Sequence, residues 1–129
     1  MADYSILEER TSERATLQLR MASNGLHLDF IGEIDMRDPE QALLDFLVHT
    51  DGIVAGREQK ELFVDFTQLT YMNSSGIKLL ITWLMGIREL PPEKQFVIIV
   101  HHDPESAWQT SCMPILQKIL PDFVRIDSP

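Results

Sequence analysis

The stretch ELFVDFTQLTYMNSSGI at residues 61–77 decides the fold, because it joins a buried strand to the start of a helix. Residues 62–66 form an apolar run broken only by Asp65, which is typical of a strand buried on both faces of a parallel sheet. Residues 67–72 predict a short polar loop. Asn73 and the two serines after it favour a helix start, because their side chains accept hydrogen bonds from the free N–H groups of a first turn.

The helix after this loop has an apolar stripe with helical period. The stripe follows the spacing i, i+3, i+4, i+7 and consists of Ile77, Leu80, Ile81 and Leu84. On this phase the outer face carries Lys78, Leu79, Thr82 and Gly86. We expect this face to be a docking surface with Leu79 as an exposed apolar contact. The alternative is a single exposed leucine without a function, which is common on protein surfaces.

Ser74 and Ser75 fall at the N-terminus of this helix, after the carboxyl end of the buried strand. The first-turn N–H groups and the helix dipole favour negative charge there, so a phosphate on a serine hydroxyl would be stabilised. The alternative is that the two serines only cap the helix, which is a common role for serine.

Two motifs resemble those of STAS domains, the sulfate-transporter and anti-sigma-factor-antagonist family. Residues 69–77 are similar to the family's segment behind a buried strand: an aspartate, two small hydroxyl residues, a glycine and an apolar helix. Residues 32–35, Gly-Glu-Ile-Asp, are similar to the Gly-Glu-(Leu or Ile)-Asp that closes an earlier strand of the family. The resemblance covers residues 16–126. It implies an α/β fold: a mixed β-sheet with helices packed mainly on one face and an N-terminal β-hairpin.

The resemblance also implies a function. The chain would be a signalling regulator of the anti-sigma factor antagonist type, not an enzyme, and without a cofactor of its own. It would bind a serine kinase/anti-sigma factor of the GHKL ATPase type, be released by serine phosphorylation, and be reset by a serine phosphatase. The family's phosphoacceptor is usually the second hydroxyl residue, which is Ser75 here, with Ser74 as the neighbouring cap and second choice. The residues expected to bind the partner are Asp35, Asn73, Ser74, Gly76, Lys78, Leu79 and Thr82.

Asn73 stands where the family usually has aspartate. Asparagine keeps the capping geometry and loses the charge, so a second hypothesis stays open: a STAS-like adaptor in another bacterial signalling pathway that is never phosphorylated. A third hypothesis is a small hydrolase that uses Ser75, His101 and Asp65. The sequence has no Gly-x-Ser-x-Gly elbow to support it.

The rest of the chain predicts a hairpin followed by alternating strands and helices. Asn24-Gly25 is a strong hairpin signal between strands at residues 14–21 and 26–34. Asp38 is expected to cap a helix that either ends or is interrupted at Asp51-Gly52, or continues through residues 53–55 to Gly56. Residues 96–100 predict a second buried strand, and Pro114 should kink or split a helix over residues 105–120. A short edge strand is expected at residues 123–126.

Composition limits the kind of protein. The 129 residues are expected to form one domain, with residues 1–13 polar and partly flexible around a short strand at 4–7. No apolar run reaches the roughly 20 residues of a membrane span, and the single cysteine, Cys112, excludes an internal disulfide and fits a cytoplasmic location. The formal net charge of −9 argues against nucleic acid as a partner and favours a basic protein face.

Overall fold

The structure is a computed structural model that describes residues 4–127. Across these residues a single six-stranded sheet has the order β1-β2-β3-β4-β5-β6. The strands are β1 (Tyr4–Ser12), β2 (Ala15–Ala22), β3 (Gly25–Ile34), β4 (Glu61–Met72), β5 (Val97–His101) and β6 (Val124–Asp127). The helices are α1 (Pro39–Ala55), α2 (Ser74–Arg88) and α3 (Ala107–Ile119), with a 3₁₀ turn η1 (Pro92–Lys94). The predicted mixed α/β fold is confirmed.

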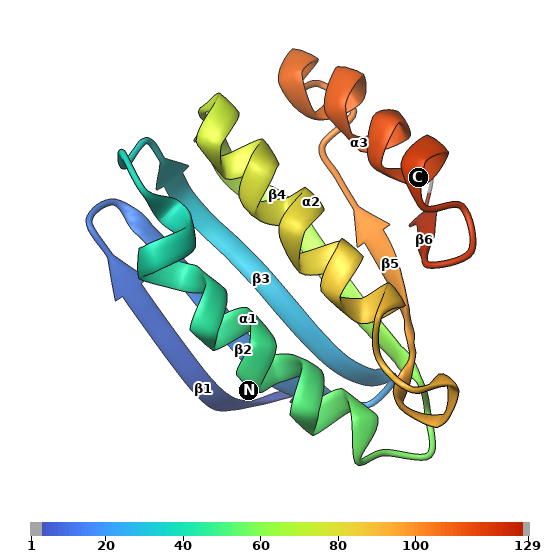
Figure 1. The fold of residues 1–129 in the computed structure, drawn as a ribbon. Coiled ribbons are helices and arrows are strands. Elements are labelled where there is room, and N and C mark those ends of the chain that lie inside the picture. The colour runs from blue at the N-terminus through green and yellow to red at the C-terminus, as the bar shows by residue number, and fades with distance from the viewer. Residues whose placement is uncertain (1–3, 128–129) are drawn as a thin grey trace.

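The three helices cover one face of the sheet (Figure 1). Strands β3 to β6 are parallel and follow one another across the sheet in chain order. Each connection between them is a crossover through one helix. Because such crossovers are right-handed and all three move in the same direction, their helices must fall on the same side. The opposite face of the sheet carries no helix among the described residues.

The N-terminal hairpin forms as predicted. Ala22 pairs with Gly25 across a two-residue turn, and Gly25 has a φ of +129°. The strand expected at residues 4–7 is longer than predicted, because β1 runs over Tyr4–Ser12 and pairs with β2. A bulge between Ile6 and Glu8 interrupts this pairing.

The prediction of a polar loop at residues 67–72 is wrong, since β4 continues to Met72. Its pairing with β3 continues to Met72, but its pairing with β5 ends at Asp65, so carbonyls on the β5 side beyond that point have no neighbouring strand. Gln109 of α3 replaces that strand: its Nε2 donates to the carbonyl oxygens of Phe66 at 2.7 Å and Leu69 at 2.9 Å. The side chain is 1% exposed. Buried carbonyls need such partners, so Gln109 allows β4 to extend past its neighbour.

The buried face of α2 differs from the predicted one. Its buried residues are Gly76, Leu79, Leu80, Trp83, Leu84 and Ile87. The expectation that Leu79 is exposed is wrong, because its side chain is 0% exposed. Ile77 and Ile81 are only half-buried. Apolar residues lie on more than half of this helix, so a four-residue stripe did not determine its phase.

The other two helices are each continuous in the structure. Asp38 caps α1 as predicted, with Oδ1 accepting from the N–H of Gln41 at 3.2 Å. The helix passes through Gly52 without a break and ends at Ala55. Pro114 lies inside α3 and does not split it. Within residues 4–127, no helix is both long and apolar enough to cross a membrane.

Candidate functional site

The carboxyl ends of β3 and β4 place two helix N-termini side by side. The strands are parallel, and their last residues, Ile34 and Met72, pair with each other. The segment leading into α1 and the start of α2 therefore meet at one edge of the sheet (Figure 1). Each helix N-terminus presents free N–H groups and the positive end of a dipole. This edge favours negative charge.

Asn73 joins the two segments through both ends of its side-chain amide. Its Oδ1 accepts from the N–H of Gly76 at 2.8 Å and caps α2, as the sequence predicted. Its Nδ2 donates to the carbonyl oxygen of Met36 at 2.9 Å. The N–H of Asn73 also donates to the carbonyl of Ile34 at 2.9 Å. An aspartate has no proton at neutral pH to donate to Met36, so asparagine suits this site better.

Asn73→Asp is expected to lower the free energy of unfolding by about 1–2 kcal/mol at pH 7. The loss of the bond to the Met36 carbonyl costs about 1–3 kcal/mol, which the helix dipole offsets by about 0.3–1 kcal/mol. Urea unfolding of the wild type and the variant measures the difference. Repeating it below the pKa of an aspartate provides the control, because a protonated carboxyl can donate to Met36. An Asn73→Asp variant as stable as the wild type at pH 7 would contradict this role.

Gly76 lets the first turn of α2 approach the sheet. A Cβ at this position would lie 2.4 Å from Cγ of Met72 and 3.0 Å from Cγ2 of Ile34. Both contacts are at the ends of the two strands that support the site. The glycine is required for close packing, and because it is buried it offers little surface to a partner.

Gly76→Ala is expected to lower the free energy of unfolding by about 1–3 kcal/mol, because the added methyl group overpacks this contact. Gly86→Ala, in the same helix, is the matched control. A Cβ there would meet nothing within 4 Å. That substitution should raise stability by about 0.5–1 kcal/mol, because alanine costs less entropy than glycine in a helix. Equal unfolding midpoints in urea for the two variants would contradict the packing argument.

Ser75 lines a small pocket between the two helix starts. The pocket has a volume of about 170 Å³, and its other lining residues are Arg37, Asp38, Pro39, Glu40 and Lys78. Both acids already have partners: Asp38 caps α1, and Oε1 of Glu40 accepts from the hydroxyl of Thr82 at 3.2 Å. Within residues 4–127, neither Arg37 nor Lys78 forms an ion pair. Ser75, a half-buried residue, thus shares a pocket with two cations that form no ion pair in the described part of the chain.

The other predicted residues are spread around this edge. Ser74 is exposed and is the first residue of α2, so the prediction that it caps the helix is wrong. Asp35 is also exposed, pairs with Arg14 at 3.4 Å and does not line the Ser75 pocket. Lys78 is exposed, and Thr82 is half-buried against Glu40. Leu79 is covered completely, so a partner cannot reach it in this conformation.

The proposed hydrolase residues do not come together. Asp65 and His101 pair across β4 and β5 and line a pocket on the open face of the sheet with Arg20 and Asp127. Ser75 lines the pocket at the start of the helices instead. No three His, Cys, Asp or Glu side chains in the described part of the chain are placed to hold a metal ion.

A second group of functional interest was not predicted. Asp51 lies on α1 and is 7% exposed, and its Oδ1 accepts from Nε1–H of Trp83 at 2.7 Å. Burial raises the pKa of Asp51 to about 7, against the opposing effect of the hydrogen bond from Trp83. The sequence interpretation considered Asp51-Gly52 only as a point where the helix ends, is interrupted or continues. The signal was the position of Asp51 four residues after Leu47 and three before Val54, on the buried face of the helix.

Solved structures share this fold. SiaC of Pseudomonas aeruginosa matches with a TM-score of 0.63 at 16% identity, over 97% of this chain and 99% of that chain. An anti-sigma factor antagonist from Mycobacterium paratuberculosis matches with a TM-score of 0.52 at 19% identity, over 90% of this chain and 89% of that chain. An uncharacterised protein of the DUF3478 family from Shewanella loihica, described as having a SpoIIAA-like fold, matches with a TM-score of 0.51 at 13% identity, over 92% and 91%.

No protein-family model and no curated protein matches this sequence. The matches to solved structures identify the fold as the SpoIIAA-like fold of STAS domains. The resemblance drawn from the two sequence motifs is therefore confirmed at the level of the fold.

Proposed function

We propose that this chain, with its STAS-type fold, is a signalling regulator that binds a protein partner at the edge where α1 and α2 begin, and that phosphorylation of Ser75 controls the binding. The observation that carries this proposal is the environment of the Ser75 hydroxyl. Ser75 lines the pocket between two helix N-termini with Arg37 and Lys78, and the two acids of that pocket, Asp38 and Glu40, already have hydrogen-bond partners. Both cations lack an ion-pair partner within residues 4–127. This environment would stabilise a phosphoserine.

The switch follows from local electrostatics. Phosphorylation adds about −1.5 to −2 charge and three acceptor oxygens at neutral pH. The phosphate would form charge-assisted hydrogen bonds with Arg37, Lys78 and the first-turn N–H groups. A partner that uses the same cations and the same helix starts would then lose its contacts.

The partner that we propose is a GHKL-type serine kinase/anti-sigma factor, with a serine phosphatase that removes the phosphate. ATP and magnesium would belong to the kinase. The net charge of −9 would favour a basic surface on this partner around the groups that contact Arg37 and Lys78. The proposal places the reaction in the cytoplasm and the regulated step in transcription. The partner-binding surface would consist of Asp35, Asn73, Ser74, Lys78 and the polar end of Thr82.

A constitutive adaptor is the second candidate. Asn73 favours it, because the neutral amide that ties α2 to Met36 occupies the position of the family's usual aspartate. In that case the same edge binds a partner and Ser75 is never phosphorylated.

Pull-down from host lysate separates the two candidates. The baits are the wild type, Ser75→Glu and the control Ser23→Glu, which adds the same charge at the exposed turn between β2 and β3, away from the starts of α1 and α2. The switch predicts that the wild type and Ser23→Glu recover a histidine-kinase-like ATPase and that Ser75→Glu recovers at least tenfold less. Equal recovery by all three baits would support the adaptor instead.

A further inference from the structure

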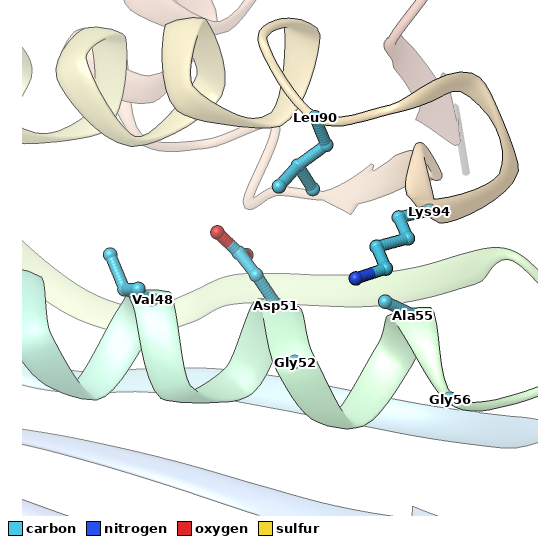
Figure 2. Close-up of a pocket in the computed structure, with 7 residues that line it drawn as sticks. All are labelled: Val48, Asp51, Gly52, Ala55, Gly56, Leu90 and Lys94. Atoms are coloured by element: carbon cyan, nitrogen blue, oxygen red, sulfur yellow. The ribbon is translucent and has the colours of Figure 1, made fainter.

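A second pocket lies at the other end of α1, away from Ser75. Figure 2 shows its lining: residues of α1 on one side, and Leu90 and Lys94 across from them. The full lining is Val48, Asp51, Gly52, Ala55, Gly56, Leu90 and Lys94. Its volume of about 450 Å³ falls within the range of small-molecule sites. The Ser75 pocket is instead at the N-terminus of α1, so the two sites are separate.

Asp51 is an unexpected side chain to bury here. Its only hydrogen bond in the described structure is the one that Oδ1 accepts from Trp83. An asparagine would accept the same bond without the cost of placing a charge in an apolar environment. No cation within residues 4–127 pairs with Asp51. Among the described residues, one carboxylate oxygen of Asp51 therefore accepts no hydrogen bond and its negative charge has no paired cation.

Lys94 supplies the opposite charge on the far wall. Figure 2 shows its amine directed along α1 toward the Asp51 side of the pocket. The two groups do not form an ion pair, and Lys94 has no other acidic partner in the described part of the chain. The apolar side chains of Val48, Ala55 and Leu90 lie around them. The pocket thus offers one negative group, one positive group and an apolar surface.

We propose that this pocket binds a zwitterionic α-amino acid with an apolar side chain. The ligand ammonium donates to the unused oxygen of Asp51, and the ligand carboxylate pairs with the ammonium of Lys94. The apolar side chain packs on Val48, Ala55 and Leu90. Each charge of the ligand thereby meets its complement, and Asp51 gains the cation that the fold does not provide.

Binding should weaken as the pH falls from 8 to 6. Asp51 must be ionised to accept the ligand ammonium, and burial raises its pKa to about 7. The only other titratable group that lines the pocket is Lys94 from η1. Trp83 and Leu90, which face Asp51 from α2 and the turn after it, do not titrate.

The test uses NMR of the full chain, with the indole N–H of Trp83 as the probe because it contacts Asp51 directly. The proteinogenic amino acids are added singly at millimolar concentration, together with two truncated analogues of leucine: isoamylamine and 4-methylpentanoate. An apolar amino acid should shift the Trp83 signal, and its amine and acid analogues should bind at least tenfold more weakly. The proposal is overturned if no apolar amino acid shifts this signal, or if the amine binds as well as the amino acid.

Variants test whether the ligand ammonium binds to Asp51 and the ligand carboxylate to Lys94. Asp51→Asn keeps the acceptor for Trp83 and should lower affinity for the amino acid at least tenfold. Lys94→Gln should remove the preference for the amino acid over its amine. Lys118→Gln, an exposed lysine on α3, is the control and should change neither. Wild-type affinity in a folded Asp51→Asn protein would overturn the proposal.

Discussion

Asp51→Asn is expected to stabilise the protein by up to about 4 kcal/mol at pH 8 and to change stability little at pH 4. The pKa of Asp51 rises from 3.8 to about 7 on folding, because the carboxyl is buried on α1. Between these two values the folded protein holds a proton that the unfolded chain has lost. The stability of the wild type therefore falls as the pH rises through this window, and it stays at the lower level above pH 7. Asparagine cannot ionise, so the variant avoids the free-energy cost of a buried carboxylate and still accepts the hydrogen bond from Trp83.

Urea unfolding at intervals from pH 4 to pH 8 measures this effect. Asp45→Asn is the matched control on the same helix. Asp45 is exposed, and its hydrogen bond with Arg10 lowers its pKa, so its replacement should give no gain at pH 8. A difference between Asp51→Asn and the wild type that does not change with pH would contradict the buried ionisation.

Gly32→Ala is expected to lower the free energy of unfolding by about 3–5 kcal/mol, from backbone strain and overpacking together. Gly32 has a φ of +93°, which L side chains rarely adopt, and a Cβ there would lie 2.1 Å from the carbonyl oxygen of Arg14. That oxygen cannot easily move, because it accepts from the N–H of Glu33 at 3.1 Å. A loss of this size is a large part of the stability of a small domain.

Gly52→Ala provides the comparison for Gly32→Ala. Gly52 lies within α1, and a Cβ there would meet nothing within 4 Å. The two variants should differ in opposite directions from the wild type in their urea midpoints. If Gly32→Ala unfolds at the same urea concentration as Gly52→Ala, the close contact with Arg14 does not have the proposed importance.

The features that the sequence predicted well have local causes. Asn24-Gly25 favours the hairpin turn in which it lies, and Asp38-Pro39 favours a helix start at its own position. Asn73 caps the helix that begins at the next residue. The glycines of the two STAS-like motifs also have structural roles, because a Cβ at Gly32 or Gly76 would overlap with neighbouring atoms.

The features that the sequence did not predict depend on tertiary contacts. β4 extends to Met72 because it pairs with β3 on one side and because Gln109, forty residues beyond Leu69, satisfies carbonyls on the other side. The phase of α2 is determined by what packs on it, and Leu79 faces the core although it looked like a surface residue. Asp51 is a polar residue that is nevertheless buried. Its hydrogen-bond partner, Trp83, comes from another helix, so the sequence alone does not show this contact.

The most direct test of the central claim is to find which residue carries phosphate. Cleavage after Lys60 and Lys78 releases one tryptic peptide, residues 61–78, that contains both Ser74 and Ser75. The protein is purified from its host with phosphatases inhibited, and fragment-ion mass spectrometry localises any phosphate within this peptide. The switch predicts one phosphate on Ser75 and none after Ser75→Ala. A peptide that carries no phosphate, or carries it on Ser74, would contradict the assignment of Ser75 as the switch.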